Sequence, residues 1–441
     1  MKINQIELKN FRNYEKEIIK FSSGTNVFIG QNAQGKTNIL EAIYLCASAR
    51  SHRTGKDIEL IKDGHSFYQV KINFDGEELK DQSLKIEYRT EPRLMRDIYY
   101  CDIKQDKIGD LFGLFHAVIF APEDLMLIKD GPSVRRRFLD VLISQIRPLY
   151  FRNLQLFQQY LRQRNQLLKT LKEMLFQKKI NPKSFQAELY DFNLIQLSIW
   201  TEKLAETETE IILMREKYIE KIQQYAGEAL ATISDQTEKL KINYKTISNI
   251  DTKADKKTIY KQLLNRYENQ IDNDIQRGNT GSGTHRDDLE IYVNDNLLKE
   301  RGSQGQQRSA VLSIKLAELK IIENETQEKP VLLLDDVMSE LDEKRRVHLF
   351  SAFEDNQVFI TCTELAQIYP KFKGKLIDAE ENSQFLEEKD NDKYFDHTEL
   401  TEIQVKTSKN SLKSDLSLIN ENGYIHFYKI DKGTVKSQIL V

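Results

Sequence analysis

The sequence has little cysteine and no long apolar run. Its three cysteines, Cys46, Cys101 and Cys362, lie far apart, and their spacing matches neither a disulfide framework nor a zinc site. We predict that all three are buried, reduced thiols. No stretch reaches the roughly 18 apolar residues that a membrane-spanning helix needs, and the alternating residues 1–11 lack the apolar centre of a signal peptide. These absences predict a soluble, cytoplasmic protein.

An excess of one charge is also absent, because 65 basic and 68 acidic residues give a net charge of -3. The total therefore does not reveal a polyanion-binding protein, and any nucleic-acid surface would need basic residues gathered on one face. Charged residues still make up 30% of the 441 residues, which suits long solvated helices better than a compact barrel. This length allows two or three domains.

The local pattern changes twice along the chain. Short apolar or alternating segments predict strands at 2–9, 16–21, 27–29, 67–74, 82–89, 118–120, 239–246, 288–293, 331–334, 358–362 and 423–430. Helical periods are found at 36–47, 133–177, 185–230 and 305–324, with Pro148 expected to break the second of these. The two long helices, joined near Pro182, form either a hairpin arm or part of an ordinary helical bundle.

A phosphate-binding loop is the strongest motif. Residues 30–37 read GQNAQGKT, which fits G-x-x-x-x-G-K-[ST] between a predicted strand and a predicted helix. Such a loop directs backbone N–H groups at phosphate oxygens, while Lys36 reaches the β and γ phosphates and Thr37 coordinates Mg²⁺. The cofactors are therefore ATP and Mg²⁺, and the predicted nucleotide-binding residues are Gly30, Gln31, Asn32, Ala33, Gln34, Gly35, Lys36 and Thr37.

A second motif ends the apolar strand at 331–334 with two carboxylates. We expect Asp335 to hold Mg²⁺ together with Thr37, and Asp336 to orient or deprotonate the attacking water. The predicted catalytic residues are Asp336 and the phosphate-binding Lys36. Thr37 and Asp335 are about 300 residues apart, farther than in a GTPase or a small kinase. This distance indicates an ATPase head interrupted by an inserted arm.

A third motif, SQGQQ at 303–307, opens the last predicted helix. In an ABC-type head, small and polar residues at this place form a second anion site that contacts the γ-phosphate bound by a partner subunit. ATP would then hold a homodimer together. The residues involved are Ser303, Gln304, Gly305 and Gln306. The alternative is a plain capping box, in which Ser303 and Gln306 satisfy the first helical turn.

Taken in order, these segments resemble the RecF family, whose heads are similar to those of SMC and Rad50 proteins. The resemblance covers about residues 1–370 and rests on 8–14, the phosphate loop with Asn38, 50–54, 120–125, 135–140, 163–165, 284–289, 303–308 and 335–342. Beyond 371 only 427–433 resembles the usual family ending, so the role of 375–421 is open.

The resemblance implies a slow, timing ATPase that dimerises on ATP and binds DNA at single-strand gaps and duplex junctions. It also implies RecO and RecR as partners in loading RecA, and adds Asn38 to the nucleotide-binding residues. Arg12, after the first strand, is placed to approach the nucleotide, unless its turn is simply solvated. Candidate contacts to DNA phosphates are Arg50, Arg53, Arg135, Arg136 and Arg137. For the last three, the alternative is ion pairing with Asp124, Asp130 or Asp140.

Other ATPase classes fit less well. An SMC or Rad50-type chromosome-maintenance head is the main alternative, but its arms need hundreds of residues, and the helices predicted here have about 45 each, or about 65 Å. A transporter ATPase would carry a switch histidine where this chain has Thr363 and Glu364. A metabolic kinase has no use for an anion site that acts on a partner subunit.

The predicted fold class is therefore α/β: an ABC-type P-loop ATPase head assembled from both ends of the chain, with an inserted α-helical hairpin arm. The expected domains are 1–130 and 236–375 for the two parts of the head, 131–235 for the arm, and 376–441 for a polar extension that ends in a strand.

Overall fold

The computed structural model describes residues 1–180, 185–246, 250–339, 341, 345–346, 348–349, 353, 355–363 and 425–440. The chain forms two compact units. Unit 1 comprises Met1–Asp124 and Glu318–Val441, and unit 2 comprises Leu125–Ala317. Four predicted features lie outside the described residues: the turn around Pro182, Glu340 and Asp342 of the segment 335–342, Glu364, and the extension at 376–421.

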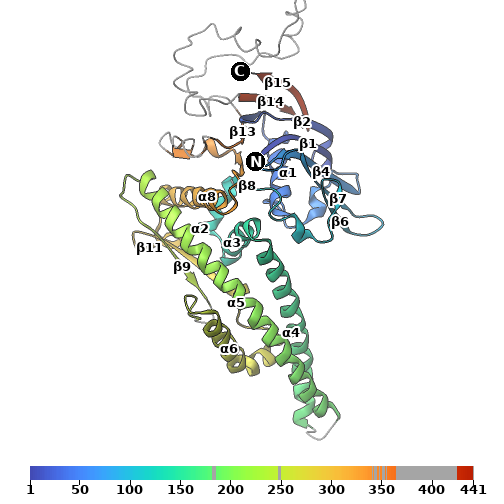
Figure 1. Cartoon of the computed structure of the whole chain (residues 1–441). Helices are drawn as coiled ribbons and strands as arrows, with labels where there is room; N and C mark the ends of the chain where they lie inside the picture. The colour runs from blue at the N-terminus through green and yellow to red at the C-terminus, as the bar shows by residue number, and fades with distance from the viewer. Residues whose placement is uncertain are drawn as a thin grey trace, which may run out of the picture. The chain divides into compact units, whose positions relative to one another are not determined.

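Unit 1 contains two six-stranded sheets (Figure 1). The first is antiparallel, in the order β2-β1-β4-β5-β6-β7, with bounds Tyr14–Lys20, Lys2–Phe11, Phe67–Asp75, Gln82–Arg89, Met95–Tyr100 and Ile103–Lys104. The second has the order β15-β14-β3-β13-β12-β8, with bounds Thr434–Leu440, Ile425–Asp431, Thr25–Ile29, Val358–Cys362, Val331–Asp335 and Ala117–Phe120.

Every pairing in the second sheet is parallel except that of β15 with β14. Its central strands are fully buried, which explains why β12 and β13 are continuous apolar runs rather than alternating ones. Helix α1 (Lys36–Ser48) packs against strands of both sheets. The carboxyl ends of β3 and β12 meet at one edge, which brings together the two motifs that the sequence separates by about 300 residues.

Unit 2 is mostly helical. Its helices are α2 (Met126–Lys129), α3 (Pro132–Ile146), α4 (Pro148–Ile180), α5 (Phe185–Ile233), α6 (Lys256–Arg277), α7 (Leu298–Arg301) and the first part of α8 (Gln304–Thr326). A small antiparallel sheet has the order β11-β10-β9, with bounds Asn296–Leu297, Asp288–Val293 and Leu240–Lys245. Helices α4 and α5 run side by side as a hairpin, and α6 packs against both (Figure 1).

The arm therefore combines features of the two predicted alternatives, because a hairpin is braced by a third helix. Buried side chains of all three helices form one cluster: Leu168, Leu171, Tyr190, Leu197 and Ile275. Pro148 begins α4, as a proline at a first helical position does, and so separates it from α3. The sequence did not predict α6, whose buried face is narrow within a polar segment.

Two expectations differ from the structure. Residues 236–317, expected in the head, belong to unit 2 together with the helices. Cys101 is exposed rather than buried, because it lies in the turn between β6 and β7 with a positive φ of 47°. Cys46 and Cys362 are buried as predicted, and all three cysteines are free thiols. Among the described residues, no helix is both long enough and apolar enough to cross a membrane.

Candidate nucleotide-binding site

The phosphate loop leaves β3 at Ile29 and enters α1 at Lys36. Gly35, the residue before the helix, has a φ of 118°, which only glycine adopts without strain. A Cβ atom there would lie 2.6 Å from Nδ2 of Asn13, so the position has no room for a side chain. The hydroxyl of the buried Tyr14 donates to the Gly35 carbonyl at 3.1 Å. The loop is therefore held from outside by the turn between β1 and β2.

Lys36 lies inside this loop. Its ammonium group donates to the carbonyl oxygens of Gly30 and Gln31, at 2.5 and 2.9 Å. Burial lowers the pKa of Lys36, while the nearby Cys362, Asp336 and Asp335 act in the opposite direction. The ammonium is thus placed within the curve of the loop, where a phosphate oxygen can replace a carbonyl as its acceptor.

Thr37 and Asp335 meet at the edge of the sheet. The Thr37 hydroxyl donates to Oδ1 of Asp335 at 2.8 Å, and the Thr361 hydroxyl of β13 donates to the same oxygen at 2.7 Å. Neighbouring ligands of an octahedral Mg²⁺ with bonds of about 2.1 Å lie about 3.0 Å apart. Thr37 and Asp335 therefore fit as two neighbouring ligands of one Mg²⁺. Burial raises the pKa of Asp335, and the two hydroxyls partly oppose that rise.

Asp336, the proposed catalytic carboxylate, is exposed at the end of β12 and has a positive φ of 51°. Its N–H donates to the Thr361 hydroxyl at 2.9 Å. Thr361 consequently fixes both carboxylate residues of the motif, because one hydroxyl bonds the Asp335 side chain and the Asp336 backbone. The sequence predicts the strand that carries Thr361 but not this role. A hydroxyl residue on the strand paired with the second motif is the signal that would have indicated it.

Asparagine side chains connect the β1–β2 turn to the loop and to α1. Asn13 donates to the Gln34 carbonyl at 2.7 Å and accepts from the Asn38 amide at 2.8 Å. The Oδ1 atom of Asn38 in turn accepts from Arg53 at 3.1 Å. Asn38, predicted to touch the nucleotide, is thus oriented on both sides by protein contacts.

Arg12 makes a two-pronged ion pair with Glu41, at 2.9 and 2.7 Å. Glu41 is fully buried on α1, and it also accepts from the Ser51 hydroxyl and lies 3.7 Å from Arg53. Arg12 and Arg53 are therefore anchored beside the loop by one buried carboxylate that the sequence analysis missed. It stays a prediction that Arg12 contacts the nucleotide. It likewise stays a prediction that Arg53 and the exposed Arg50 contact DNA.

The C-terminal hairpin also touches the phosphate loop. In the turn between β14 and β15, Lys432 and Gly433 donate their N–H groups to the side-chain and main-chain oxygens of Gln34, at 2.5 and 3.0 Å. A Cβ atom on Gly433 would lie 2.6 Å from the Asn13 carbonyl, and one on Gly30 would lie 2.5 Å from the Ile430 carbonyl. Backbone from three parts of the chain is in close contact here.

The third motif begins α8 in unit 2. The Gln306 N–H donates to Oγ of Ser303 at 3.2 Å, and the Ser303 N–H donates to Oε1 of Gln306 at 3.0 Å. These are the two bonds of a capping box, so the alternative considered for this motif is confirmed. Ser303 and Gln304 are nevertheless exposed at the helix N-terminus. Such a cap leaves their side chains accessible, and contact with a partner's nucleotide stays a prediction.

Comparison with known proteins agrees with this geometry. The family model "RecF/RecN/SMC N terminal domain" matches residues 2–384. RecF of Ruminiclostridium cellulolyticum, a DNA replication and repair protein, is 41% identical over 87% of this chain and 96% of its own length. RecF of Lactobacillus johnsonii is 42% identical over 83% of this chain and 94% of its own.

The chain belongs to the RecF family. Two solved structures of the recombination mediator protein RecF in the RecFOR pathway, one with ATP and one described as RecF-ATPrS, have TM-scores of 0.76 and 0.75. Each is 32% identical and covers 99% of this chain and 97% of its own. The fold is thus that of an ABC-type ATPase head, and the family consists of ATP-binding DNA replication and repair proteins.

Within the arginine run 135–137 of this RecF-family chain, Arg135 has a structural role. Arg135 is buried and pairs with both carboxylate oxygens of Asp288, at 2.7 and 3.0 Å. The prediction of DNA contact is therefore wrong for Arg135. Arg135 does form an ion pair, as the alternative expected, but its partner is Asp288 and none of Asp124, Asp130 and Asp140. Arg136 is half-buried and donates to the Asp287 carbonyl at 2.5 Å, and the exposed Arg137 stays a prediction.

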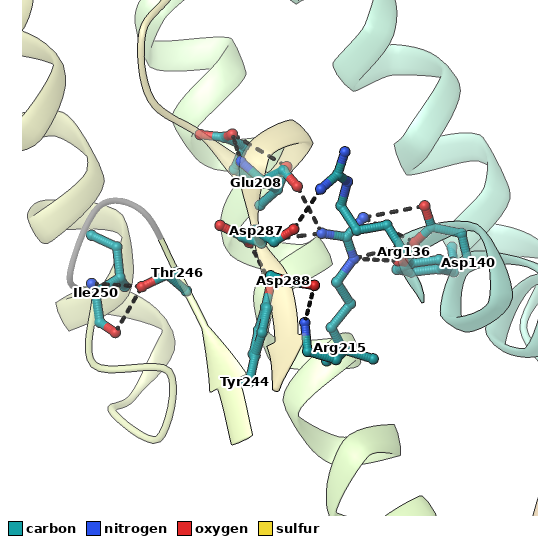
Figure 2. A network of polar contacts seen from close by, with 12 residues as sticks. Arg136, Asp140, Glu208, Arg215, Tyr244, Thr246, Ile250, Asp287 and Asp288 are labelled. Atoms are coloured by element: carbon teal, nitrogen blue, oxygen red, sulfur yellow. Dashed lines mark hydrogen bonds and ion pairs between the residues drawn. The ribbon is translucent and has the colours of Figure 1, made fainter. Parts of the chain in front are cut away.

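Asp287 and Asp288 belong to a buried polar network in unit 2 (Figure 2). At its centre the Arg215 guanidinium bonds Asp140 at 3.0 Å, and it lies 3.7 Å from Asp287. Tyr244 donates to Asp287 at 2.7 Å. These bonds join α3, α5 and β9 to Asp287, the residue before β10, which gives this acidic residue of the 284–289 segment a packing role.

Proposed function

We propose that this chain binds ATP and Mg²⁺ at the loop Gly30–Thr37, hydrolyses ATP slowly, and uses the nucleotide to close a dimer on DNA. The observation that carries the proposal is the meeting of Lys36, Thr37 and Asp335 at the edge of the parallel sheet. These residues come from two motifs about 300 residues apart in the sequence. Their types and distances fit the phosphates and the metal ion of MgATP.

Bound Mg²⁺ would neutralise phosphate charge and polarise the γ-phosphoryl group. The chain's own residues do the rest. Backbone N–H groups of the loop and the Lys36 ammonium stabilise negative charge on the phosphate oxygens. The exposed carboxylate of Asp336 orients a water molecule or accepts its proton. Thr361 keeps both aspartates in place through its single hydroxyl.

Dimerisation follows from the third motif. Ser303 and Gln304 are exposed at the N-terminus of α8, where the helix dipole favours an anion. In the proposed dimer this end of α8 contacts the γ-phosphate held by the other subunit. ATP would then be part of the interface, and its hydrolysis would release the dimer.

The biological role we propose is recombinational repair in the cytoplasm. RecF relatives are DNA replication and repair proteins, and the solved RecF structures belong to the RecFOR pathway. We propose that this chain recognises single-strand gaps and duplex junctions, and acts with RecO and RecR to load RecA. The helices α4 and α5, with 33 and 49 residues, are far shorter than the arms an SMC or Rad50-type head requires.

Light scattering of the full chain tests this function. We expect a monomer that becomes a dimer when ATP and Mg²⁺ are added, and that retains a gapped duplex only in that state. The variant Lys36→Met should stay monomeric under all conditions. A chain that remains monomeric with MgATP, and ignores the gapped duplex, would exclude the proposed clamp.

Asp336→Asn separates binding from hydrolysis. Removing this carboxylate should lower the hydrolysis rate about 100-fold or more, the usual size of a general-base contribution, while ATP still binds. The dimer should therefore persist longer after ATP is added. Measuring phosphate release together with dimer lifetime checks both expectations. A variant that hydrolyses ATP at the wild-type rate would show that Asp336 is not the catalytic carboxylate.

A further inference from the structure

A basic cavity lies in unit 2, where the C-terminal end of α6 meets the middle of α4. Its volume is about 740 Å³. The lining includes three cations and one carboxylate, together with two amides: Asn165, Lys169, Lys172, Glu173, Arg277 and Asn279. We call it the α4–α6 cavity. It contains none of the residues assigned above to ATP or DNA.

Within the described part of the chain, the cations of this cavity have no acidic partner. Lys169, Lys172 and Arg277 are exposed, and none of them makes an ion pair or a hydrogen bond with any residue that the structure describes. Just behind the cavity, by contrast, Arg164 is buried and fully paired with Asp274 at 2.9 Å. Three neighbouring unpaired cations repel one another, and an anion between them removes that cost.

The walls of the cavity are held by buried contacts. The N–H and hydroxyl of Thr280 both donate to Oδ1 of Asn165, at 2.8 and 2.7 Å, so the Asn165 amide is oriented. Its NH₂ group remains available as a donor to a ligand. Gly278, with a φ of 73°, lies against the stems of Lys172 and Lys169, where a Cβ atom would be 3.4 and 3.5 Å from their carbons. Packed stems reduce the entropy that the lysines lose when they bind an anion.

We propose that the α4–α6 cavity binds phosphates of a nucleic-acid strand. This inference rests on the proposed DNA-binding function and adds a site on the arm. The volume exceeds what a single phosphate group needs, and the cations come from two helices, so adjacent phosphates of one backbone fit better than one free ion. The lining has no aromatic side chain to stack on a base. Binding here is therefore independent of base sequence and sensitive to salt.

The double variant Lys169→Gln/Lys172→Gln tests the site. Binding of a fluorescein-labelled gapped duplex is measured by anisotropy at several NaCl concentrations, with MgATP present. If the two lysines contact two phosphates, the slope of log affinity against log salt should become shallower by about 1.4 to 1.8. Arg277→Gln removes one cation and should make the slope shallower by about half as much. Duplexes of different base sequence should respond alike.

A matched control is Lys257→Gln/Lys261→Gln. These lysines are exposed on α6, form no side-chain hydrogen bond or ion pair with any described residue, and give the same change in net charge. Fluorescence of Trp200, the only tryptophan, located on α5, confirms that each variant of unit 2 is folded. Equal slopes for the cavity variant and the control would overturn the proposed site and leave DNA binding by the chain intact.

A wild-type chain that binds no DNA would contradict the proposed function instead. Inorganic tripolyphosphate is then titrated into the same proteins at low salt. Binding that is lost in Lys169→Gln/Lys172→Gln but kept in the control would show an anion site whose ligand is not nucleic acid, which overturns the proposed ligand. Absence of binding to both probes would overturn the site itself.

Discussion

At the scale of the residue, Thr361 connects both acidic residues of the ATPase motif. In the wild type, the hydrogen bond from the Thr361 hydroxyl lowers the pKa of Asp335. Replacing Thr361 by valine removes this bond and also the one that the Asp336 N–H donates to the hydroxyl. Mg²⁺ needs the ionised carboxylate, so activity is lost as pH falls through the pKa of Asp335. We expect Thr361→Val to shift this loss to higher pH and to reduce the rate of ATP hydrolysis. Thr361→Ser keeps the hydroxyl and should resemble the wild type in a pH–rate profile.

A second residue-scale prediction concerns Glu208, fully buried in unit 2. Burial raises its pKa to about 7, although the Tyr267 hydroxyl and the Thr284 N–H donate to it. Because the folded state holds this proton more tightly than the unfolded state, its stabilising effect is complete below about pH 4.5 and is lost as pH rises through about 7. The loss is on the order of 3 kcal/mol.

The variant Glu208→Gln should remove this dependence. Glutamine resembles the protonated acid, so wild-type stability should fall relative to the variant between about pH 4.5 and 7. Urea unfolding followed through Trp200, which lies in the same unit, gives the comparison. A constant difference between the two proteins across this range would mean that Glu208 does not titrate there.

At the scale of the element, the β14–β15 hairpin positions the phosphate loop through its turn. In Gly433→Ala, the new Cβ atom would lie 2.6 Å from the Asn13 carbonyl, at a φ of 77°. Because Gly433 and Asn13 both bond the Gln34 carbonyl, displacing either moves the loop. We expect ATP affinity to fall about tenfold, equivalent to a loss of about 1.4 kcal/mol.

Gly64→Ala provides the matched control for that element. Gly64 has a similar φ of 83°, but a Cβ atom there would meet nothing within 4 Å. Both variants should therefore lose about 1 kcal/mol of stability through backbone strain. Only Gly433→Ala should weaken ATP binding, measured by calorimetry. Similar affinities for the two variants would show that the hairpin does not position the loop.

At the scale of the whole molecule, the proposed dimer combines the phosphate loop of one chain with the α8 end of another. Lys36→Met and Ser303→Arg should each abolish hydrolysis alone. A mixed dimer contains one intact site, formed by the phosphate loop of the Ser303→Arg chain and the α8 end of the Lys36→Met chain, so an equal mixture should recover activity that neither variant has alone. Mixing Lys36→Met with Asp336→Asn restores no site and is the control. A Lys36→Met and Ser303→Arg mixture as inactive as its components would contradict a shared site.

Much of the fold was predictable from local pattern. The predicted strands and the helix 36–47 were confirmed with ends within a few residues, because alternation, short apolar runs and the glycine loop are properties of neighbouring residues. Helix α6 was not predicted, since its few buried residues are spread through a polar segment. They include Ile259, Leu263 and Tyr267. These residues form a buried face only because α6 packs against α4 and α5.

The sequence by itself determined the phosphate loop, the acidic strand end, the family and the presence of an inserted helical arm. Each depends on residue types at fixed spacing, which the chain carries locally. Only the tertiary structure decided that Thr361 holds both aspartates, that Glu41 anchors Arg12, that the C-terminal turn contacts Gln34, and that Arg135 pairs with Asp288. Such partners are distant in sequence, so sheet order and helix packing select them, and no local pattern specifies them.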